Sequence, residues 1–296
     1  MDSRLIVSRK SVKNFYGSKI KVLSPAKINL YLNILGKYPS GFHKIESIAE
    51  RISLFDEITI TIAKHNDIKI YCNKKDLENC ENLCVKAARL LKEKYKINFG
   101  FDIRLFKRIP VGSGLGGGSS NAALTMLAIN ELCKLNLSQK VLYKLGSLIG
   151  SDVNFFLAQS RFAIISGKGE KVLPIEGKTL KHTIIWPGVS LATKRVYGNY
   201  RGKLTKFLNN VNILTCALKK GDNYLVKNSI FNALENSALC LCVELSAAKN
   251  KLFKNGIFSK VTGSGSAIYT LCKESLQRKI KSILPEDYFV FHAQTF

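Results

Sequence analysis

The chain has 296 residues, of which 46% are hydrophobic and 23% charged, and its formal net charge is +25. This length and composition are typical of a globular protein with one large or two ordinary domains, and they exclude general disorder. The chain has no apolar run long enough to span a bilayer, and residues 1–13 lack the apolar core of a signal peptide, so we predict a cytoplasmic protein without a membrane partner.

The first half of the chain is predicted to be rich in strands. Residues 20–35 alternate strictly between apolar and polar, the pattern of a half-buried strand with Lys27 and Asn29 on its polar face. Alternation also predicts strands at 58–62, 68–70, 101–109 and 162–166. Helical spacing predicts helices at 82–96, 119–134 and 138–149.

The second half, from about Pro174, alternates strands with helices. Strands are predicted at 183–186, around Tyr269 and at 288–292, and helices at 204–218, 223–241, 243–254 and 274–283. There is no internal repeat and no low-complexity segment. We therefore predict the α+β fold class, with two domains at residues 1–170 and 171–296.

The placement of the cysteines and of the basic residues limits which metal sites and partners are expected. The eight cysteines form no CxxC pair and the four histidines are scattered, so no zinc site is expected; most cysteines should be small buried residues in a reducing compartment. The basic residues are spread over the whole chain rather than gathered beside a nucleic-acid motif. A nucleic-acid partner is therefore not expected. A positive field also serves a polyanionic small-molecule substrate, and much of the charge is expected to be a solvated, lysine-rich surface, so the charge alone does not decide the partner. The sequence does not specify an oligomeric state.

A glycine-rich segment separates the predicted strand 101–109 from the predicted helix 119–134. Glycine costs chain entropy and is needed where the backbone approaches a ligand or takes positive φ. The first amide groups of the following helix are unpaired and carry the positive end of its dipole. We therefore predict a phosphate site in this glycine loop, made of Pro110, Val111, Gly112, Ser113, Gly114, Leu115, Gly116, Gly117, Gly118, Ser119 and Ser120.

Two other phosphate motifs fit the chain poorly. Three glycines of the loop match GxGxxG, but the acidic residue at the required distance, Glu131, lies inside the next predicted helix, and the flanking units are not βαβ. A P-loop needs a lysine at its end. Residues 177–179 supply that ending, but Val172 occupies the first glycine position. A glycine-rich turn without a ligand is the third alternative.

Three ordered segments together resemble the GHMP kinase superfamily. Residues 110–123 resemble its P-x-x-x-GLGGGSSNAA signature, residues 24–30 (SPAKINL) its PAK-x-NL motif, and residues 261–267 (VTGSGSA) its second glycine turn. The resemblance covers nearly the whole chain after an extension of about 18 residues, whose role stays open. It implies an S5-like N-terminal domain and a ferredoxin-like C-terminal domain.

Further segments are similar to one branch, the diphosphocytidyl-methylerythritol kinases. These are residues 41–43 (GFH), 150–156 (GSDVNFF), 167–170 and 187–190. The resemblance implies transfer of the γ-phosphoryl group of ATP, with Mg²⁺, to the 2-hydroxyl of 4-diphosphocytidyl-2-C-methyl-D-erythritol. A GHMP kinase for another alcohol, such as homoserine or mevalonate, and an inactive nucleotide-binding relative are the alternatives.

The resemblance assigns catalysis to two residues. Asp152 would be the general base that takes the proton from the substrate hydroxyl, and Lys27 the cation that keeps Asp152 ionised. Without the resemblance, Asp152 reads as a helix N-cap and Lys27 as an exposed strand lysine.

The resemblance also assigns substrate contacts. Asn29 would bind the sugar alcohol, Phe42 and Tyr197 would stack on the cytosine, and His43 would hydrogen-bond its edge; Gly263 and Ser264 would approach a phosphate. Ser119 and Ser120 would contact ATP phosphates, one of them helping to hold Mg²⁺. The alternatives are plain core packing for the aromatic residues, solvent exposure for Asn29 and, for Asn82, an N-cap rather than an adenine contact. In this chain Phe42 replaces the usual tyrosine and Asn154 the usual proline.

Overall fold

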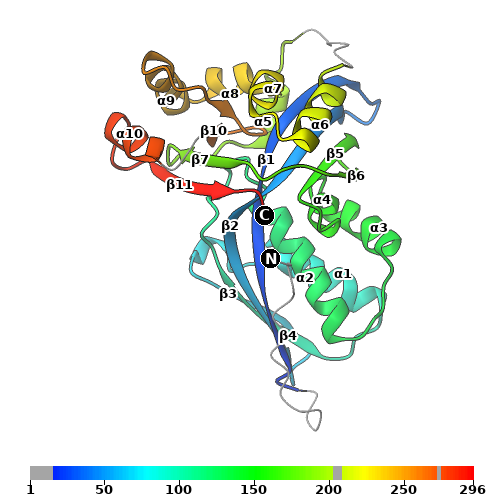
Figure 1. Cartoon of the computed structure of the whole chain (residues 1–296). Helices are drawn as coiled ribbons and strands as arrows, with labels where there is room; N and C mark the ends of the chain where they lie inside the picture. The colour runs from blue at the N-terminus through cyan, green and yellow to red at the C-terminus, as the bar shows by residue number, and fades with distance from the viewer. Residues whose placement is uncertain (1–15, 203–208, 272–274) are drawn as a thin grey trace. The chain divides into compact units, whose positions relative to one another are not determined.

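The computed structural model describes residues 16–202, 209–271 and 275–296 (Figure 1). The chain forms two compact units. Of the described residues, the first unit contains those up to Pro25, Phe55–Ile109 and Gly117–Gln159; the second contains those in Ala26–Leu54, Pro110–Gly116 and Ser160–Phe296. Two long strands, β1 (Lys19–Lys37) and β2 (His43–Ala63), contribute residues to both units. The division into 1–170 and 171–296 stays a prediction.

The first unit packs helices with a sheet. Its strands follow the order β3-β4-β2-β1, in which β4 (Gly100–Phe106) is antiparallel to β2 and parallel to β3 (Ile68–Cys72). A short 3-10 turn, η1 (Lys75–Leu77), leads to α1 (Leu83–Lys94), which contacts β3 and β4. The alternating isoleucines of β2 are fully or almost fully buried, as their spacing predicts: Ile58, Ile60 and Ile62.

Helix α2 (Gly117–Leu132) is the central helix of the first unit. It contacts α1, α3 (Gln139–Ile149) and α4 (Val153–Leu157). Its alanines let these neighbours approach on several sides, and they are fully buried: Ala122, Ala123 and Ala128. The helix begins at Gly117, two residues before the predicted start, so the last glycines of the glycine loop already belong to its first turn.

The second unit contains a four-stranded sheet of order β11-β7-β10-β9 (Figure 1). Its strands are β7 (Lys181–Trp186), β9 (Lys260–Val261), β10 (Ile268–Leu271) and β11 (Phe289–Gln294). β5 (Phe162–Gly167) pairs with β2 and β6 (Lys171–Ile175), and β8 (Phe231–Asn232) runs parallel to β1. The helices are α5 (Thr193–Gly198), α6 (Asn209–Lys220), α7 (Asn223–Ser229), α8 (Glu235–Leu241), α9 (Val243–Lys254) and α10 (Ser275–Ile283).

Three expectations were wrong. Residues 24–34 of β1 are buried on both faces rather than on one. The single helix expected over 223–241 is two helices, α7 and α8, because β8 between them pairs with β1 and leaves the helical path. Most cysteines were expected to be buried, but of the seven described only Cys72, Cys84 and Cys242 are.

Some predictions fall partly outside the described residues. The starts of the helices expected at 204–218 and 274–283 lie there, as does most of the N-terminal extension. The short elements β6 and α5 were not predicted. None of the helices in the described ranges is long and apolar enough to cross a membrane.

Asn82 is the N-cap of α1, which was one of the two roles considered for this residue. Its Oδ1 accepts a hydrogen bond from the Cys84 amide at 2.9 Å, and its Nδ2 donates to the Leu77 carbonyl at 2.9 Å. We expect Asn82→Ala to lower the free energy of unfolding by about 1 kcal/mol because one orphan amide loses its acceptor. Chemical denaturation measures this, with Asn82→Ser as the control that keeps an acceptor. Equal stability of both variants and the wild type would contradict the capping role.

Candidate active site

The first part of the glycine loop, Pro110–Gly116, lies in the second unit and is tied to two other segments. The Gly112 carbonyl accepts a hydrogen bond from the Leu191 amide at 2.9 Å, and Ser190 Oγ donates to the Val111 carbonyl at 2.6 Å. A Cβ on Gly112 would lie 2.6 Å from the Cβ of Ser190. Glycine is therefore required here for close backbone approach as well as for its positive φ of 66°.

The second glycine turn, residues 262–266, packs directly against this part of the loop. Gly114 has φ +80°, and a Cβ on it would lie 2.4 Å from the Thr262 carbonyl oxygen. The Ala267 amide donates to the Ser113 carbonyl at 2.9 Å. Two of the three motifs found in the sequence are thus brought together by backbone contact.

Lys27 and Asn29 lie beside these turns, in the buried part of β1. Only 5% of Lys27 and 6% of Asn29 is exposed, so the alternatives of an exposed strand lysine and a solvent-facing asparagine are wrong. Lys27 Nζ donates to Asn29 Oδ1 at 2.5 Å. A Cβ on Gly263 would lie 3.2 Å from Asn29 Oδ1 and 3.4 Å from Lys27 Nζ. A buried ammonium therefore faces the backbone of the second glycine turn.

Neighbouring side chains fix this pair in place. Asn29 Nδ2 donates to Ser47 Oγ at 2.8 Å, and the Asn29 amide donates to Thr262 Oγ1 at 3.0 Å. Asn232 Nδ2 donates to the Gly263 carbonyl at 2.9 Å. Sequence analysis did not select Ser47, which lies in no predicted element, or Asn232, which lies in a predicted helix. Thr262 lies in the motif of the second glycine turn, but the resemblance assigned it no role.

The predicted cytosine contacts form a second group in this unit. The rings of His43 and Tyr197 lie with centroids 5.0 Å apart and planes tilted by 33°. Phe42 is 55% exposed, which excludes plain core packing, and Lys168 Nζ lies 5.2 Å from its ring centroid. Burial, and then the nearby Lys37 charge, lower the pKa of His43 below its ordinary value of 6.5. Ser264 lies outside this group and shares a hydrogen bond of 3.0 Å with Thr193.

The rest of the glycine loop, Gly117–Ser120, belongs to the first unit. It forms the first turn of α2, whose leading amides are available to an anion. Ser120 is fully buried and its Oγ accepts a hydrogen bond from Ser24 Oγ at 2.7 Å. Ser119 is half-buried, so it is the more accessible of the two serines.

Asp152 directly precedes α4 in the first unit. It stands at the N-cap position and is half-buried, but its side chain makes no capping hydrogen bond. The simple N-cap alternative therefore does not explain this residue. The neighbouring Asn154, where the related motif has proline, donates through Nδ2 to Ser147 Oγ at 2.9 Å and lies within α4.

In the second unit the site thus brings together the first part of the glycine loop, the second glycine turn and the buried Lys27 against that turn. The family model for the GHMP kinase N-terminal domain matches residues 82–159, and the model for the C-terminal domain matches residues 216–289. These matches and the site place the chain in the GHMP kinase class and confirm the predicted fold class. The two matched ranges fall on opposite sides of the predicted boundary at residue 170.

Comparison with individual proteins identifies the branch. The chain is 36% identical over 253 residues to the 4-diphosphocytidyl-2-C-methyl-D-erythritol kinase of Caldanaerobacter subterraneus, covering 85% of this chain and 87% of that protein. It is 36% identical over 259 residues to the kinase of the same name from Clostridioides difficile, covering 86% and 87%. The chain belongs to the 4-diphosphocytidyl-2-C-methyl-D-erythritol kinase family.

Solved structures agree. A crystal structure of 4-(cytidine 5'-diphospho)-2C-methyl-D-erythritol kinase matches with a TM-score of 0.76 and 27% identity, covering 93% of this chain and 99% of that one. Homoserine kinase from Cytophaga hutchinsonii matches with a TM-score of 0.73 and 19% identity, covering 97% and 96%. The second match shows the shared fold alone.

Proposed function

We propose that this protein transfers the γ-phosphoryl group of ATP to the 2-hydroxyl of 4-diphosphocytidyl-2-C-methyl-D-erythritol. The observation that carries the proposal is the buried Lys27 ammonium, held by Asn29 against the second glycine turn. Kinases use such fixed charges to stabilise the charge that develops on the transferring phosphoryl group. The activity named for the relatives supports the choice of alcohol.

In the proposed reaction, Asp152 takes the proton of the 2-hydroxyl. The hydroxyl oxygen forms a bond to the γ-phosphorus, the bond from that phosphorus to the oxygen bridging the β- and γ-phosphates breaks, and ADP leaves. Lys27 stabilises the negative charge on the reacting oxygens. Asn29 orients Lys27 through its Oδ1 and lies beside Gly263, where it can also reach a hydroxyl of the substrate.

The phosphates of ATP are proposed to bind at the glycine loop. The amides of the first turn of α2, the backbone of Pro110–Gly116 and Ser119 supply hydrogen bonds; Ser120, which is buried, supports the turn from below. Ser119 is the candidate protein ligand for the Mg²⁺ that would accompany ATP and offset the charge of its phosphates. Among the described residues there is no group of three His, Cys, Asp or Glu side chains that could hold a metal ion.

Cytosine recognition is proposed for the group formed by Phe42, His43 and Tyr197. An exposed aromatic face at Phe42 and a second ring at Tyr197 suit stacking on a base, and the neutral His43 ring offers one donor and one acceptor to the base edge. Gly263 and Ser264 would lie near a phosphate of either substrate. Both substrates are polyanions, which suits the net charge of +25. The cytoplasmic location stays a prediction.

We expect a pH dependence of substrate binding from His43. Because its pKa is lowered from 6.5, more of the ring is neutral than charged at pH 6.5, and protonation at lower pH removes its acceptor nitrogen. KM for the cytidine substrate should therefore rise in acidic solution with a midpoint below pH 6.5. Initial rates at varied pH test this, with His43→Gln, which does not titrate, as the control. A midpoint above pH 6.5, or a rise that persists in His43→Gln, would contradict the assignment.

A coupled assay of ADP release tests the proposed function. Purified protein with Mg-ATP is offered the cytidine-linked methylerythritol, homoserine or mevalonate at equal concentration. We expect turnover with the first only, and a His43→Ala variant that loses affinity for it. Turnover with homoserine or mevalonate and none with the cytidine compound would refute the choice of substrate.

A further inference from the structure

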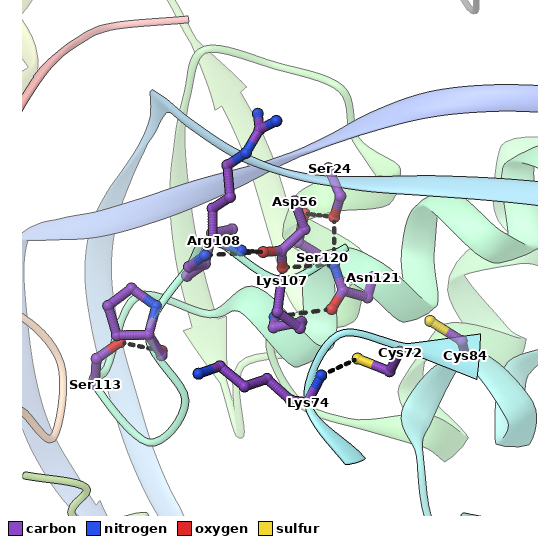
Figure 2. Close-up of polar contacts among 12 residues, drawn as sticks. Ser24, Asp56, Cys72, Lys74, Cys84, Lys107, Arg108, Ser113, Ser120 and Asn121 are labelled. Carbon is purple, nitrogen blue, oxygen red and sulfur yellow. Dashed lines mark hydrogen bonds and ion pairs between the residues drawn. The ribbon is translucent and has the colours of Figure 1, made fainter. Parts of the chain in front are cut away.

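A buried polar cluster lies beneath the start of α2 in the first unit (Figure 2). It consists of Asp56 from β2, Lys107 just after β4, and Asn121 from the first turns of α2. Asp56 is 0% exposed, Asn121 2% and Lys107 8%. The family resemblance assigns none of these side chains a role, and the proposed reaction does not use them.

The Asp56 carboxylate connects the end of β4 to α2. Its Oδ1 accepts hydrogen bonds from the amides of Arg108 and Ile109, both at 2.8 Å. Its Oδ2 accepts from the Lys107 ammonium and from Asn121 Nδ2, the latter at 2.9 Å. One carboxylate therefore fixes the backbone that leads into the glycine loop and the helix that leaves it.

Lys107 and Asn121 complete the connection. Lys107 Nζ donates to Asn121 Oδ1 at 3.0 Å, and a Cβ on Gly117 would lie 3.0 Å from the same Nζ. Asn121 Nδ2 also donates to Ser24 Oγ at 2.9 Å, and Ser24 in turn donates to Ser120. The first residue of α2 lies against the ammonium, and the next turn is held by the Asn121 side-chain amide and by the hydrogen bond from Ser24 to Ser120.

The cluster is better explained as a means of fixing the backbone than as a source of stability or of a positive field for a phosphate. A buried ion pair is often no more stabilising than apolar residues of the same volume. The charge of Lys107 is offset by Asp56 in direct contact, so little net positive field is left for a phosphate. What the pair does supply is a fixed, directional connection between two backbone segments.

We propose that Asp56, Lys107 and Asn121 are positioning residues for ATP: they hold the first turn of α2 so that its free amides meet the phosphates. The inference rests on the proposed function, because it takes the glycine loop as the ATP site. Phosphate affinity depends on the direction of these amides, and a displacement of about 1 Å at a reacting site can cost on the order of 100-fold in rate.

The test compares Lys107→Met, Asp56→Asn, the double variant and Asn121→Ala with the wild type. Titration calorimetry with a non-hydrolysable ATP analogue gives nucleotide affinity, and initial rates give KM for each substrate. We expect nucleotide affinity to fall at least about tenfold in each variant, equivalent to about 1.4 kcal/mol of binding free energy, while KM for the cytidine substrate changes less than about twofold. The double variant should regain thermal stability, because no buried charge is left unpaired, without regaining affinity.

Glu50→Gln is the matched control. Glu50 is also fully buried, and its carboxylate accepts hydrogen bonds from His182 at 3.0 Å and Thr295 at 2.5 Å, in the second unit. The Glu50→Gln substitution should lower the stability of the protein without weakening nucleotide binding. The inference is overturned if the cluster variants that fold bind the analogue as the wild type does, or if Glu50→Gln weakens binding equally. Asn121→Ala leaves the ion pair intact, so it provides a folded variant if the charge variants do not fold. A wild type that binds the analogue but turns over no substrate would refute the proposed function and leave this inference standing.

Discussion

Asp152→Asn should lower kcat by about 100- to 10,000-fold, the usual contribution of a positioned general base. Asparagine has nearly the shape of aspartate but cannot accept the proton of the 2-hydroxyl. The Asp152 side chain makes no capping hydrogen bond to α4, so the substitution should leave this helix in place. KM for ATP should stay close to the wild-type value. Steady-state rates of ADP release, at saturating concentrations of both substrates, measure the effect.

Asp222→Asn is the matched control for this prediction. Asp222 also stands at a helix N-cap, that of α7, where its carboxylate accepts a hydrogen bond from the Leu225 amide at 2.9 Å. It lies outside every motif of the site, and asparagine keeps the acceptor oxygen. We expect Asp222→Asn to have the same kcat as the wild type. A kcat of Asp152→Asn within about tenfold of the wild type, below the range given for general bases, would mean that Asp152 is not the base.

Gly114→Ala should reduce both stability and activity. Its φ of +80° is a left-handed conformation that costs an L residue about 1–2 kcal/mol. Its Cβ would also lie 2.4 Å from the Thr262 carbonyl oxygen and 3.0 Å from Gly265 N, both of them backbone atoms. The two glycine turns must therefore separate, which displaces Gly263 from Lys27 and Asn29. We expect kcat/KM to fall on the order of 100-fold.

Gly256→Ala separates the conformational cost from the contact. Gly256 has φ +70° and nothing within 4 Å of an added Cβ. Denaturant unfolding should show a loss of about 1–2 kcal/mol for this variant, a larger loss for Gly114→Ala, and no change in kcat/KM for Gly256→Ala. Equal losses of stability, with kcat/KM retained in both variants, would show that the two turns do not need to be in contact.

Much of the site could be predicted from the sequence because its motifs are local. A few adjacent residues are enough to identify each of them: the glycine loop, the SPAKINL strand and the second glycine turn. Alternation correctly predicted the strand β1, but it predicted residues 24–34 to be buried on one face only. A polar residue on a strand reads as solvent-facing unless the element that covers it is known. In the second unit Lys27 and Asn29 are covered by the turns around Gly114 and Gly263, which are far away in sequence.

The buried cluster could have been found in part. Asp56 is in phase with Ile58 and Ile60 on the inward face of β2, and Lys107 is in phase with the inward Leu105 of the β4 segment. A charge in phase with a buried face signals a buried partner. The pairing of the two strands could not be derived from alternation alone. The register that sets Ile58 opposite Leu105 brings Asp56 opposite Lys107.

The interruption of the helix expected over 223–241 could not have been predicted from the local sequence. Its sequence has helical spacing throughout, and nothing local demands an interruption. The interruption comes from β8, where Asn232 turns its side chain to the Val261 and Gly263 carbonyls, at 2.7 and 2.9 Å, and the backbone pairs with β1. Tertiary hydrogen bonds overrode helix propensity at a point that supports the second glycine turn.

The central claim is that a phosphoryl group passes directly from ATP to the 2-hydroxyl of the cytidine-linked methylerythritol. The most direct measurement is phosphorus NMR of the product formed from ATP labelled at the γ-position. The account predicts that the label appears as a phosphate monoester on the 2-carbon, in amounts equal to the ADP formed, and that Asp152→Asn forms almost none. Label that appears as inorganic phosphate, or on another hydroxyl, would contradict it.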